Sequence, residues 1–365
     1  MAVYKLFPSK DATIYSEFTE KNTGIDEILE ISKKVAGADI YLSRALMQFN
    51  QSDILDIINN KVSGSFTCWL KLYTANAEEL PTSFDIEIKP IGSEWNMGTG
   101  RYTSIPETTD GVSWGYNYND AGPVWLGTGS YATSSYVAGG GNWITSSISV
   151  SQSYTNYLNS IDLYANVTPI VQEWLSGSYT NNGFLIKRTD TDETSLTTYG
   201  PIKYFSRDTN TIYSPYLEFK WNSIVYQTGS GEIKGDDMTI ITLKNNRGIY
   251  RQNEKSNIRL NVRDIYPRRT FQTSSVFITN NILPSSSYYS IVDVHTDETI
   301  IDYDITGTRI GADSLGSYFD IDFSGLQPER YYRFVFKINY NSVEKIVDND
   351  YIFKIVRPWV IILLN

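Results

Sequence analysis

Apolar and polar residues alternate along much of the first 220 positions, which is the pattern of strands with one buried face. The alternation is clearest at residues 11–15, 28–32, 44–49 and 84–91, and turn-forming residues separate these segments. A nearly continuous apolar run from Phe66 to Tyr73 predicts a further strand. The first half of the chain is therefore predicted to be a β-sandwich.

Two segments depart from this period and predict helices. Residues 52–60 place apolar side chains three to four positions apart, with Ser52 as the expected cap of the first turn. Residues 166–177 begin with Thr168 as the expected cap and Pro169 in the first turn, and they end in glycine. We expect one short helix at each place.

Residues 92–142 form a long excursion rich in Gly, Ser, Thr and aromatic residues. A loop this long within a compact domain is functional, disordered or contains unrecognised elements, and its tryptophans make disorder the least favoured of the three. Aromatic side chains here predict a platform for sugar rings or a protein interface, with about half expected to be core. The candidates are Trp95, Trp114, Tyr116, Tyr118, Trp125 and Trp143.

The order of these segments resembles the DNRLRE-type β-sandwich, a jelly-roll domain related to carbohydrate-binding modules. The resemblance covers about residues 8–222 and implies a jelly-roll β-sandwich with one or two short helices over residues 1–225. Its matching segments are 11–14, 44–49, 68–73, Glu94-Trp95 with Trp114, 167–174, 182–184, 204–207 and 214–219.

The second half predicts a separate all-β module. Glycines and charges at residues 226–236 suit a linker. Beyond it, short strands separated by turns favour a sandwich over residues 237–357. Residues 324–336 resemble the leucine, proline, tyrosine corner of fibronectin type III and related immunoglobulin-like domains, which implies that Tyr332 bonds back to the main chain.

Residues 358–365 are predicted to be an apolar C-terminal tail. Six consecutive apolar residues are expected to be buried against protein, and two alternatives for their partner stay open. The tail is either the last strand of its own domain or a segment that docks on a neighbouring chain. The candidate docking residues are Trp359, Val360, Ile361, Ile362, Leu363 and Leu364.

Composition narrows the chemistry. A length of 365 residues predicts about two domains. A net charge of −10, without a basic tract, disfavours nucleic-acid binding.

One cysteine, Cys68, and one histidine, His295, exclude internal disulfides, multi-cysteine zinc sites and histidine-cluster metal sites. The longest apolar run is far shorter than the roughly 20 residues that cross a bilayer, so no membrane insertion is expected.

Carboxylates are the remaining option for acid–base catalysis, but their spacing does not define a pair, and we expect solvated charges and no enzyme. Residues 190–193 supply oxygens without the spacing of an EF-hand, so a turn is preferred and a structural calcium is left open; no other cofactor is expected. His295 is expected at the surface. The acidic candidates are Asp11, Asp39, Glu94, Glu173, Asp190 and Asp192.

These features together predict a structural component of a bacteriophage virion, in a tail, a collar or neck, or a capsid-associated assembly. The N-terminal segment lacks the apolar stretch of a secretory signal, which fits synthesis in the host cytoplasm. Other virion proteins and copies of the same chain are the expected partners. The alternative is a glycan-binding host-recognition or adhesin module, which needs an exposed aromatic platform near the excursion.

Overall fold

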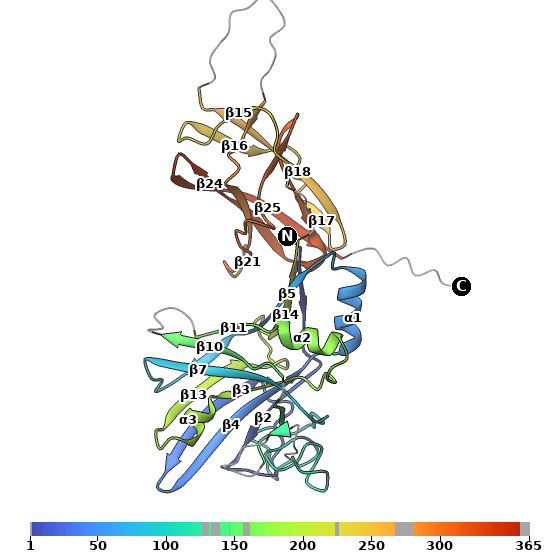
Figure 1. The fold of residues 1–365 in the computed structure, drawn as a ribbon, viewed down its shortest axis with the longest axis vertical. Helices are drawn as coiled ribbons and strands as arrows, with labels where there is room; N and C mark the ends of the chain where they lie inside the picture. The colour runs from blue at the N-terminus through green and yellow to red at the C-terminus, as the bar shows by residue number, and fades with distance from the viewer. Residues whose placement is uncertain are drawn as a thin grey trace, which may run out of the picture. The chain divides into compact units, whose positions relative to one another are not determined.

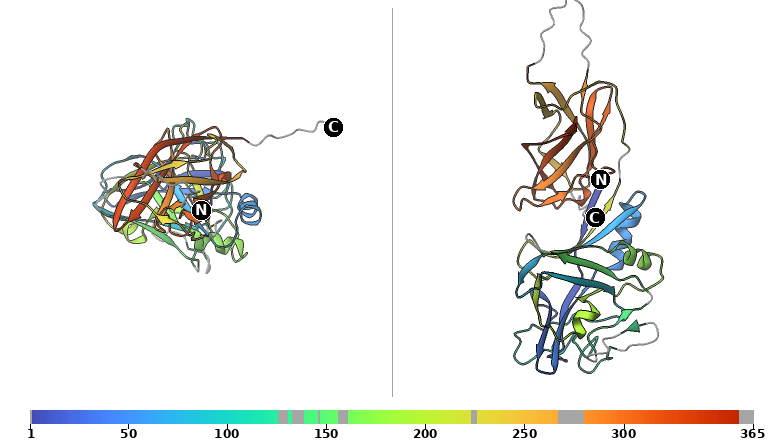
Figure 2. Two further views of the ribbon diagram at one scale, coloured as in Figure 1. Left: turned by 90° about the horizontal axis from the view of Figure 1, so that it is seen from above. Right: turned by 60° about the vertical axis from the view of Figure 1, so that its left-hand side comes forward.

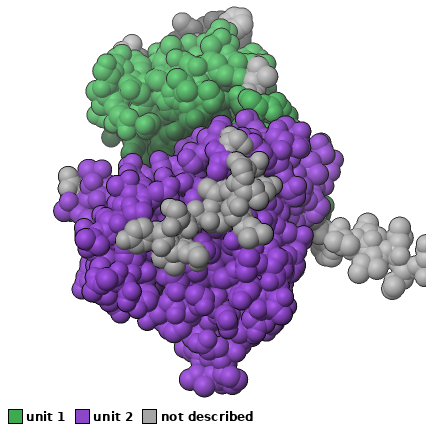
Figure 3. All heavy atoms as spheres, turned by 60° about the horizontal axis from the view of Figure 1, so that its bottom comes forward, with its two compact units in different colours: residues 1–4, 62–66, 220–365 green, residues 5–61, 67–219 purple. Residues whose placement is uncertain are grey.

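The computed structural model describes residues 2–125, 131–132, 139–145, 147–155, 161–222, 226–266 and 280–357. Strands hold 46% of the residues and helices 8%, which confirms the all-β class (Figure 1). The chain forms two compact units, coloured separately in Figure 3. The N-terminal unit comprises residues 5–61 and 67–219, and the C-terminal unit comprises residues 1–4, 62–66 and 220–365.

An eight-stranded sheet dominates the N-terminal unit. Its order is β10-β7-β12-β4-β3-β13-β6, with β2 also paired to β4, and the pairings between these strands are antiparallel. The strands are β2 (Lys10–Tyr15), β3 (Ile28–Ala36), β4 (Asp39–Gln48), β6 (Thr74–Ala77), β7 (Ser83–Pro90), β10 (Val150–Thr155), β12 (Phe184–Arg188) and β13 (Tyr199–Phe205).

A second sheet has the order β1-β14-β5-β11. It is built from β1 (Ala2–Leu6), β5 (Phe66–Leu72), β11 (Leu163–Asn166) and β14 (Tyr216–Trp221).

Both predicted helices are present, and they lie close together in Figures 1 and 2. Helix α1 (Gln51–Asn60) follows Asn50 as its N-cap instead of the predicted Ser52. Helix α2 (Thr168–Leu175) already includes Thr168, and Val167 is its N-cap. The Thr168 hydroxyl is engaged elsewhere, because it accepts a hydrogen bond from the Cys68 amide of β5 at 2.7 Å.

The described part of the excursion at 92–142 packs against one face of the eight-stranded sheet, over β2, β4 and β12. Between them lies a hydrophobic core that combines sheet residues with excursion residues. The excursion also holds β8 (Tyr131–Ala132), which pairs with β9 (Trp143–Ile144) at its end. The core residues are Ala12, Ile14, Ile40, Leu42, Leu46, Ile91, Trp95, Val112, Trp114, Trp125, Trp143 and Leu185.

Two sheets of the C-terminal unit enclose an aromatic core. Their orders are β16-β18-β23-β22 and β17-β25-β24-β20-β21. The strands are β16 (Thr239–Leu243), β17 (Ile249–Arg251), β18 (Lys255–Asp264), β20 (Ser287–Asp293), β21 (Thr299–Ile301), β22 (Gly311–Asp313), β23 (Gly316–Asp322), β24 (Tyr331–Tyr340) and β25 (Val343–Val356).

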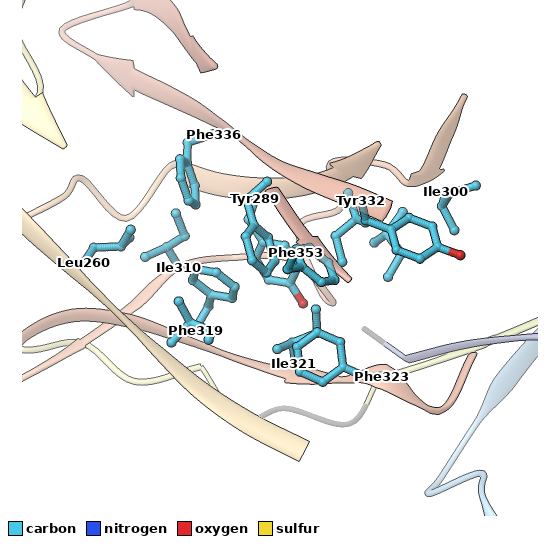
Figure 4. Close-up of a cluster of buried hydrophobic side chains, with 14 of the residues drawn as sticks. Leu260, Tyr289, Ile300, Ile310, Phe319, Ile321, Phe323, Tyr332, Phe336 and Phe353 are labelled. Atoms are coloured by element: carbon cyan, nitrogen blue, oxygen red, sulfur yellow. The ribbon is translucent and has the colours of Figure 1, made fainter. Parts of the chain in front are cut away.

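Aromatic rings from both sheets fill this core (Figure 4). Tyr289 stacks on Phe319 with ring centroids 4.3 Å apart, and Phe334 stacks on Phe353 at 4.5 Å. The predicted bond from Tyr332 to the main chain is present, because its hydroxyl accepts from the Gln327 amide at 3.0 Å. Ring stacking and this bond fix β24 within the sandwich.

The segment expected to be a linker is bonded to the C-terminal unit in part. The Ala312 amide donates to the carbonyl of Gln227, and β15 (Glu232–Ile233) pairs in parallel with β19 (Asn281–Ile282). The candidate docking residues of the tail, 359–364, lie outside the described residues. None of the helices in the described ranges is long and apolar enough to cross a bilayer.

Candidate functional site

The tryptophans of the excursion do not form the exposed platform that the sequence suggested. Trp95, Trp114, Trp125 and Trp143 are 1%, 0%, 4% and 8% exposed, because their rings pack against β2, β4 and β12 in the core. The indole N–H groups of Trp95 and Trp125 donate to main-chain carbonyls at 2.9 Å. Tyr116 is half-buried. A sugar ring cannot reach the faces of the four tryptophans, so they stabilise the fold.

Beneath this layer lies a buried group of charges that we call the sealed cluster, made of Arg44, Lys187 and Glu193. The Nε and Nη2 atoms of Arg44 donate to the two carboxylate oxygens of Glu193 at 2.9 and 2.6 Å. Lys187 Nζ lies 3.1 Å from Glu193 Oε2 and 2.6 Å from Oδ1 of the exposed Asp190. The side chains of Arg44, Lys187 and Glu193 are 0%, 0% and 5% exposed. Each buried charge therefore has an opposite charge in contact, as burial requires.

Aromatic and main-chain groups complete the cover of the sealed cluster. The Arg44 guanidinium lies 4.9 Å from the centroid of the Trp114 ring and 5.5 Å from that of Trp143. Its remaining Nη1 donates to the Gly140 carbonyl. The positive φ of 82° at Gly140 suits glycine, and a Cβ there would meet both the Trp114 ring and Arg44. The cluster is part of the framework of the sheet.

The segment 190–193 is a short helix, α3 (Asp190–Thr194), and not the predicted turn. Thr189 caps it, since its hydroxyl accepts from the Asp192 amide at 3.1 Å. Burial alone would raise the pKa of Asp190, but hydrogen bonds and charges from Lys187 and Lys89 lower it. Within the described ranges, no group of acidic, cysteine or histidine side chains is arranged to hold a metal ion.

The other candidate residues from the sequence are scattered over the fold. The acidic candidates lie on β2, β4, the loop after β7, α2 and α3. Asp11 is 1% exposed and accepts a hydrogen bond from the Arg207 amide at 2.7 Å. Burial raises the pKa of Asp11 to about 8. His295 is exposed in the turn after β20, where its amide donates to Asp293. The structure does not assemble these residues into a catalytic group.

A different set of residues lines an open pocket of about 420 Å³ in the N-terminal unit, which we call the Tyr15–Tyr102 pocket. The end of β2, the residues leading into β3, the excursion and β13 each contribute to it. The sequence analysis missed this site because no local motif joins its parts. The lining residues are Tyr15, Asp26, Glu27, Ile28, Glu30, Arg101, Tyr102 and Lys203.

The pocket combines aromatic rings with charges of both signs. The rings of Tyr15 and Tyr102 lie 5.0 Å apart at 55°, and Tyr102 stays 43% exposed. The Tyr102 amide donates to Asp26 Oδ2 at 2.9 Å, and Glu30 Oε2 lies 3.9 Å from Lys203 Nζ. Burial raises the pKa of Asp26, although the bond from Tyr102 opposes that shift. Burial together with the charges of Glu30 and Asp26 raises the pKa of Tyr15.

Buried Asn22 holds the excursion in place beside this pocket. Its Nδ2 donates to the carbonyls of Met97 and Val112 at 2.7 and 2.8 Å, and its Oδ1 accepts from the Gly100 amide at 2.8 Å. A Cβ at Gly100 would lie 2.3 Å from the Asn22 carbonyl oxygen. Asn22 therefore fixes the main chain that immediately precedes Arg101 and Tyr102.

In comparisons with known proteins, no family model matches the chain and no curated protein matches it.

Proposed function

We propose that the chain is a structural component of a bacteriophage virion, in a tail, collar or capsid-associated assembly. It acts through contacts with other virion proteins and with copies of itself. In the part of the chain that the structure describes, the aromatic and charged residues mostly stabilise two β-rich units, each with its own core. This composition suits a building block better than an enzyme.

We further propose a jelly-roll relationship for the N-terminal unit and an immunoglobulin-like one for the C-terminal unit. The large antiparallel sheet, with a second sheet of four strands, supports the first assignment. The bond between Tyr332 and Gln327, with two sheets around one aromatic core, supports the second. Modules of both kinds serve many functions, so the fold alone does not carry the functional proposal.

The observation that carries the assembly proposal is the open edge of β25. This strand runs from Val343 to Val356 and pairs with β24 on one side. On its other side β17 pairs only with residues 354–356, and no other described strand pairs with the remainder, although Lys345, Asn349 and Tyr351 donate side-chain hydrogen bonds to carbonyls of Asp236, Thr239 and Ile241. Val343 and Ile346 are 62% and 61% exposed along this part of the strand. An exposed strand edge with apolar side chains is a template for pairing with another chain.

A bulge limits how much of this edge can pair. The register between β24 and β25 shifts between Phe334 and Val335, and Asp350 adopts a φ of 53° in the bulged segment. Asp348 forms an ion pair with Arg333 at 3.1 Å beside it. Bulges and charges commonly protect edge strands from indiscriminate aggregation. The segment 343–347 is therefore the part of β25 that we expect to contact a neighbouring subunit.

The substitution Ile346→Lys tests this contact, because a charge on the pairing segment opposes strand addition. We expect the unchanged chain to form a defined oligomer in light scattering over a concentration series, and the variant to shift toward monomer. Ile212→Lys is the matched control, since Ile212 is 58% exposed in the N-terminal unit. Equal assembly of both variants would contradict the role of the β25 edge.

The virion assignment has a separate readout. Antibodies raised against the purified chain should label particles released from the host that carries the gene, at repeated positions in electron micrographs. Labelling of host material without labelling of particles would contradict the virion assignment and leave the self-association of β25 to be judged by light scattering.

A further inference from the structure

The Tyr15–Tyr102 pocket offers hydrogen-bond donors and acceptors side by side. Glu27 and Glu30 supply carboxylate oxygens, which accept when ionised, whereas Arg101 and Lys203 only donate. Neighbouring hydroxyls of a sugar ring both donate and accept, so they match such a mixed lining. The volume of about 420 Å³ lies within the roughly 300–1,000 Å³ typical of small-molecule sites.

The aromatic part of the pocket is held in place yet accessible. Tyr102 contacts the ring of Phe18 edge-on at 5.9 Å in addition to Tyr15. Lys21 lies 5.1 Å from the centroid of the Tyr102 ring and donates to the Tyr102 carbonyl at 3.2 Å. These contacts, and the Asn22 bonds to the preceding main chain, pre-organise Tyr102, a residue that is 43% exposed. An apolar C–H face of a sugar can stack on such a ring without first ordering it.

The charges select against ionic ligands. Three carboxylates, Asp26, Glu27 and Glu30, oppose a phosphate, sulfate or uronate group. Arg101 and Lys203 oppose an ammonium or guanidinium group in the same space. An uncharged polyol avoids both penalties and still uses every polar group of the lining.

We infer that the Tyr15–Tyr102 pocket binds a neutral mono- or disaccharide. Tyr102 provides the stacking surface, and Glu30, Arg101 and Lys203 provide the polar contacts. The inference goes beyond the proposed structural role, because subunit assembly through β25 does not require it. It also differs from the platform expected at the excursion tryptophans, which are buried in the core.

The experiment is a binding screen of the full chain against an array that carries neutral oligosaccharides and their sialylated or uronic-acid counterparts. We expect binding to at least one neutral oligosaccharide and weaker binding to its acidic counterpart. Titration of the best neutral sugar should show an affinity loss of about tenfold or more for Tyr102→Ala, because the stacking surface is removed. Tyr102→Phe should keep most of the affinity, since it keeps the ring.

Two further variants separate a lost contact from a lost fold. Glu30→Gln keeps the shape of the side chain and should weaken sugar binding several-fold with an unchanged circular dichroism spectrum. Tyr331→Ala is the matched control, because Tyr331 is also 43% exposed but lies in the C-terminal unit, and it should bind as the unchanged chain does. The inference is overturned if no neutral sugar binds, if the acidic counterparts bind better, or if Tyr102→Ala and Glu30→Gln bind normally.

The two proposals can fail separately. Ile346→Lys should still bind the sugar, and Tyr102→Ala should still assemble. Loss of sugar binding in Ile346→Lys without unfolding would overturn a pocket that is contained in the N-terminal unit.

Discussion

The sealed cluster and the Tyr15–Tyr102 pocket contain the same types of side chain in one unit. They differ in how deeply these side chains are buried and how closely the opposite charges approach. In the sealed cluster, Arg44 and Glu193 are at most 5% exposed and form two hydrogen bonds with each other. In the pocket, Glu30 and Lys203 approach only to 3.9 Å, and Tyr102 is 43% exposed. Aromatic and charged residues thus indicate a ligand site only where their side chains stay exposed to solvent. Where other protein groups bury them, they stabilise the fold.

The excursion accounts for this difference. Trp114 and the main chain at Gly140 cover Arg44 from above the sheet. Earlier in the same excursion, Asn22 holds the main chain at Gly100, after which Arg101 and Tyr102 are exposed. A buried charge needs its partner for the fold to be stable, whereas an exposed ion pair contributes little to the free energy of unfolding. The two regions should therefore respond very differently to the same substitution.

The largest effect is expected for Glu193→Ala. Removing this carboxylate leaves Arg44 buried without its counter-charge, while Lys187 keeps its ion pair with Asp190 at 2.6 Å. The free energy of unfolding should fall by about 3–5 kcal/mol, the usual cost of breaking a buried ion pair by removing one partner. Urea unfolding followed by tryptophan fluorescence measures this difference, since Trp114 lies beside Arg44.

The same chemical change in the pocket is the control. Glu30→Ala removes a partner of the half-exposed Lys203, so the free energy of unfolding should change by less than about 1 kcal/mol. A similar loss for both variants would mean that the sealed cluster is hydrated, and the distinction between the two regions would fail.

A smaller effect is expected for Asn22→Ala, which removes the side chain that anchors the excursion beside the pocket. The change leaves the carbonyls of Met97 and Val112 and the amide of Gly100 without the Asn22 side chain. We expect a loss of about 1–3 kcal/mol in the free energy of unfolding, the cost of unsatisfied buried groups. Hydrogen exchange of the Gly100 amide should also accelerate, because Asn22 no longer protects it.

Asn96→Ala serves as the control for this loop. Asn96 is exposed and donates a single side-chain bond, to the Asp110 carbonyl at 3.1 Å. Its removal should leave both stability and exchange at Gly100 nearly unchanged. If the two variants behave alike, Asn22 does not position the excursion.

The sequence predicts the parts of this fold that depend on local periodicity. The alternation at 84–91 correctly predicted a strand, β7, and the helical spacing at 52–60 correctly predicted helix α1. The cap of α2 differed because the Thr168 hydroxyl bonds a strand 100 positions away, which local patterns do not encode. A five-residue helix, α3, carries too few residues for a periodic signal.

The candidate site was less accessible to sequence reasoning. Trp95 and Trp114 attract attention as aromatic residues of a long loop, but their burial depends on the sheet face beneath them. The pocket joins Tyr15, Glu30, Tyr102 and Lys203 from four distant segments, so their proximity is a product of topology. The excursion residues that line the pocket are Arg101 and Tyr102, which the sequence analysis did not single out.

A third carboxylate sharpens the comparison, because Asp11 is buried without the paired cations that surround Glu193. It accepts the Arg207 amide at 2.7 Å, and burial raises its pKa to about 8 from 3.8. The folded state therefore holds this proton more tightly than the unfolded state. The resulting stabilisation is complete below about pH 4 and is lost as the pH rises through 8, with a slope of up to about 1.4 kcal/mol per pH unit.

Asp11→Asn should remove this slope, since the amide keeps an acceptor for Arg207 but does not titrate. Unfolding in urea at pH 5, 6, 7 and 8 compares the variant with the unchanged chain, and the difference between them isolates Asp11 from all other groups. Asp39→Asn, at an exposed position, should leave the pH dependence nearly as it is. If the free energies of unfolding of Asp11→Asn and of the unchanged chain depend on pH in the same way, Asp11 is ionised in the folded state. Burial alone would then not separate the carboxylates that need a cation from those that do not.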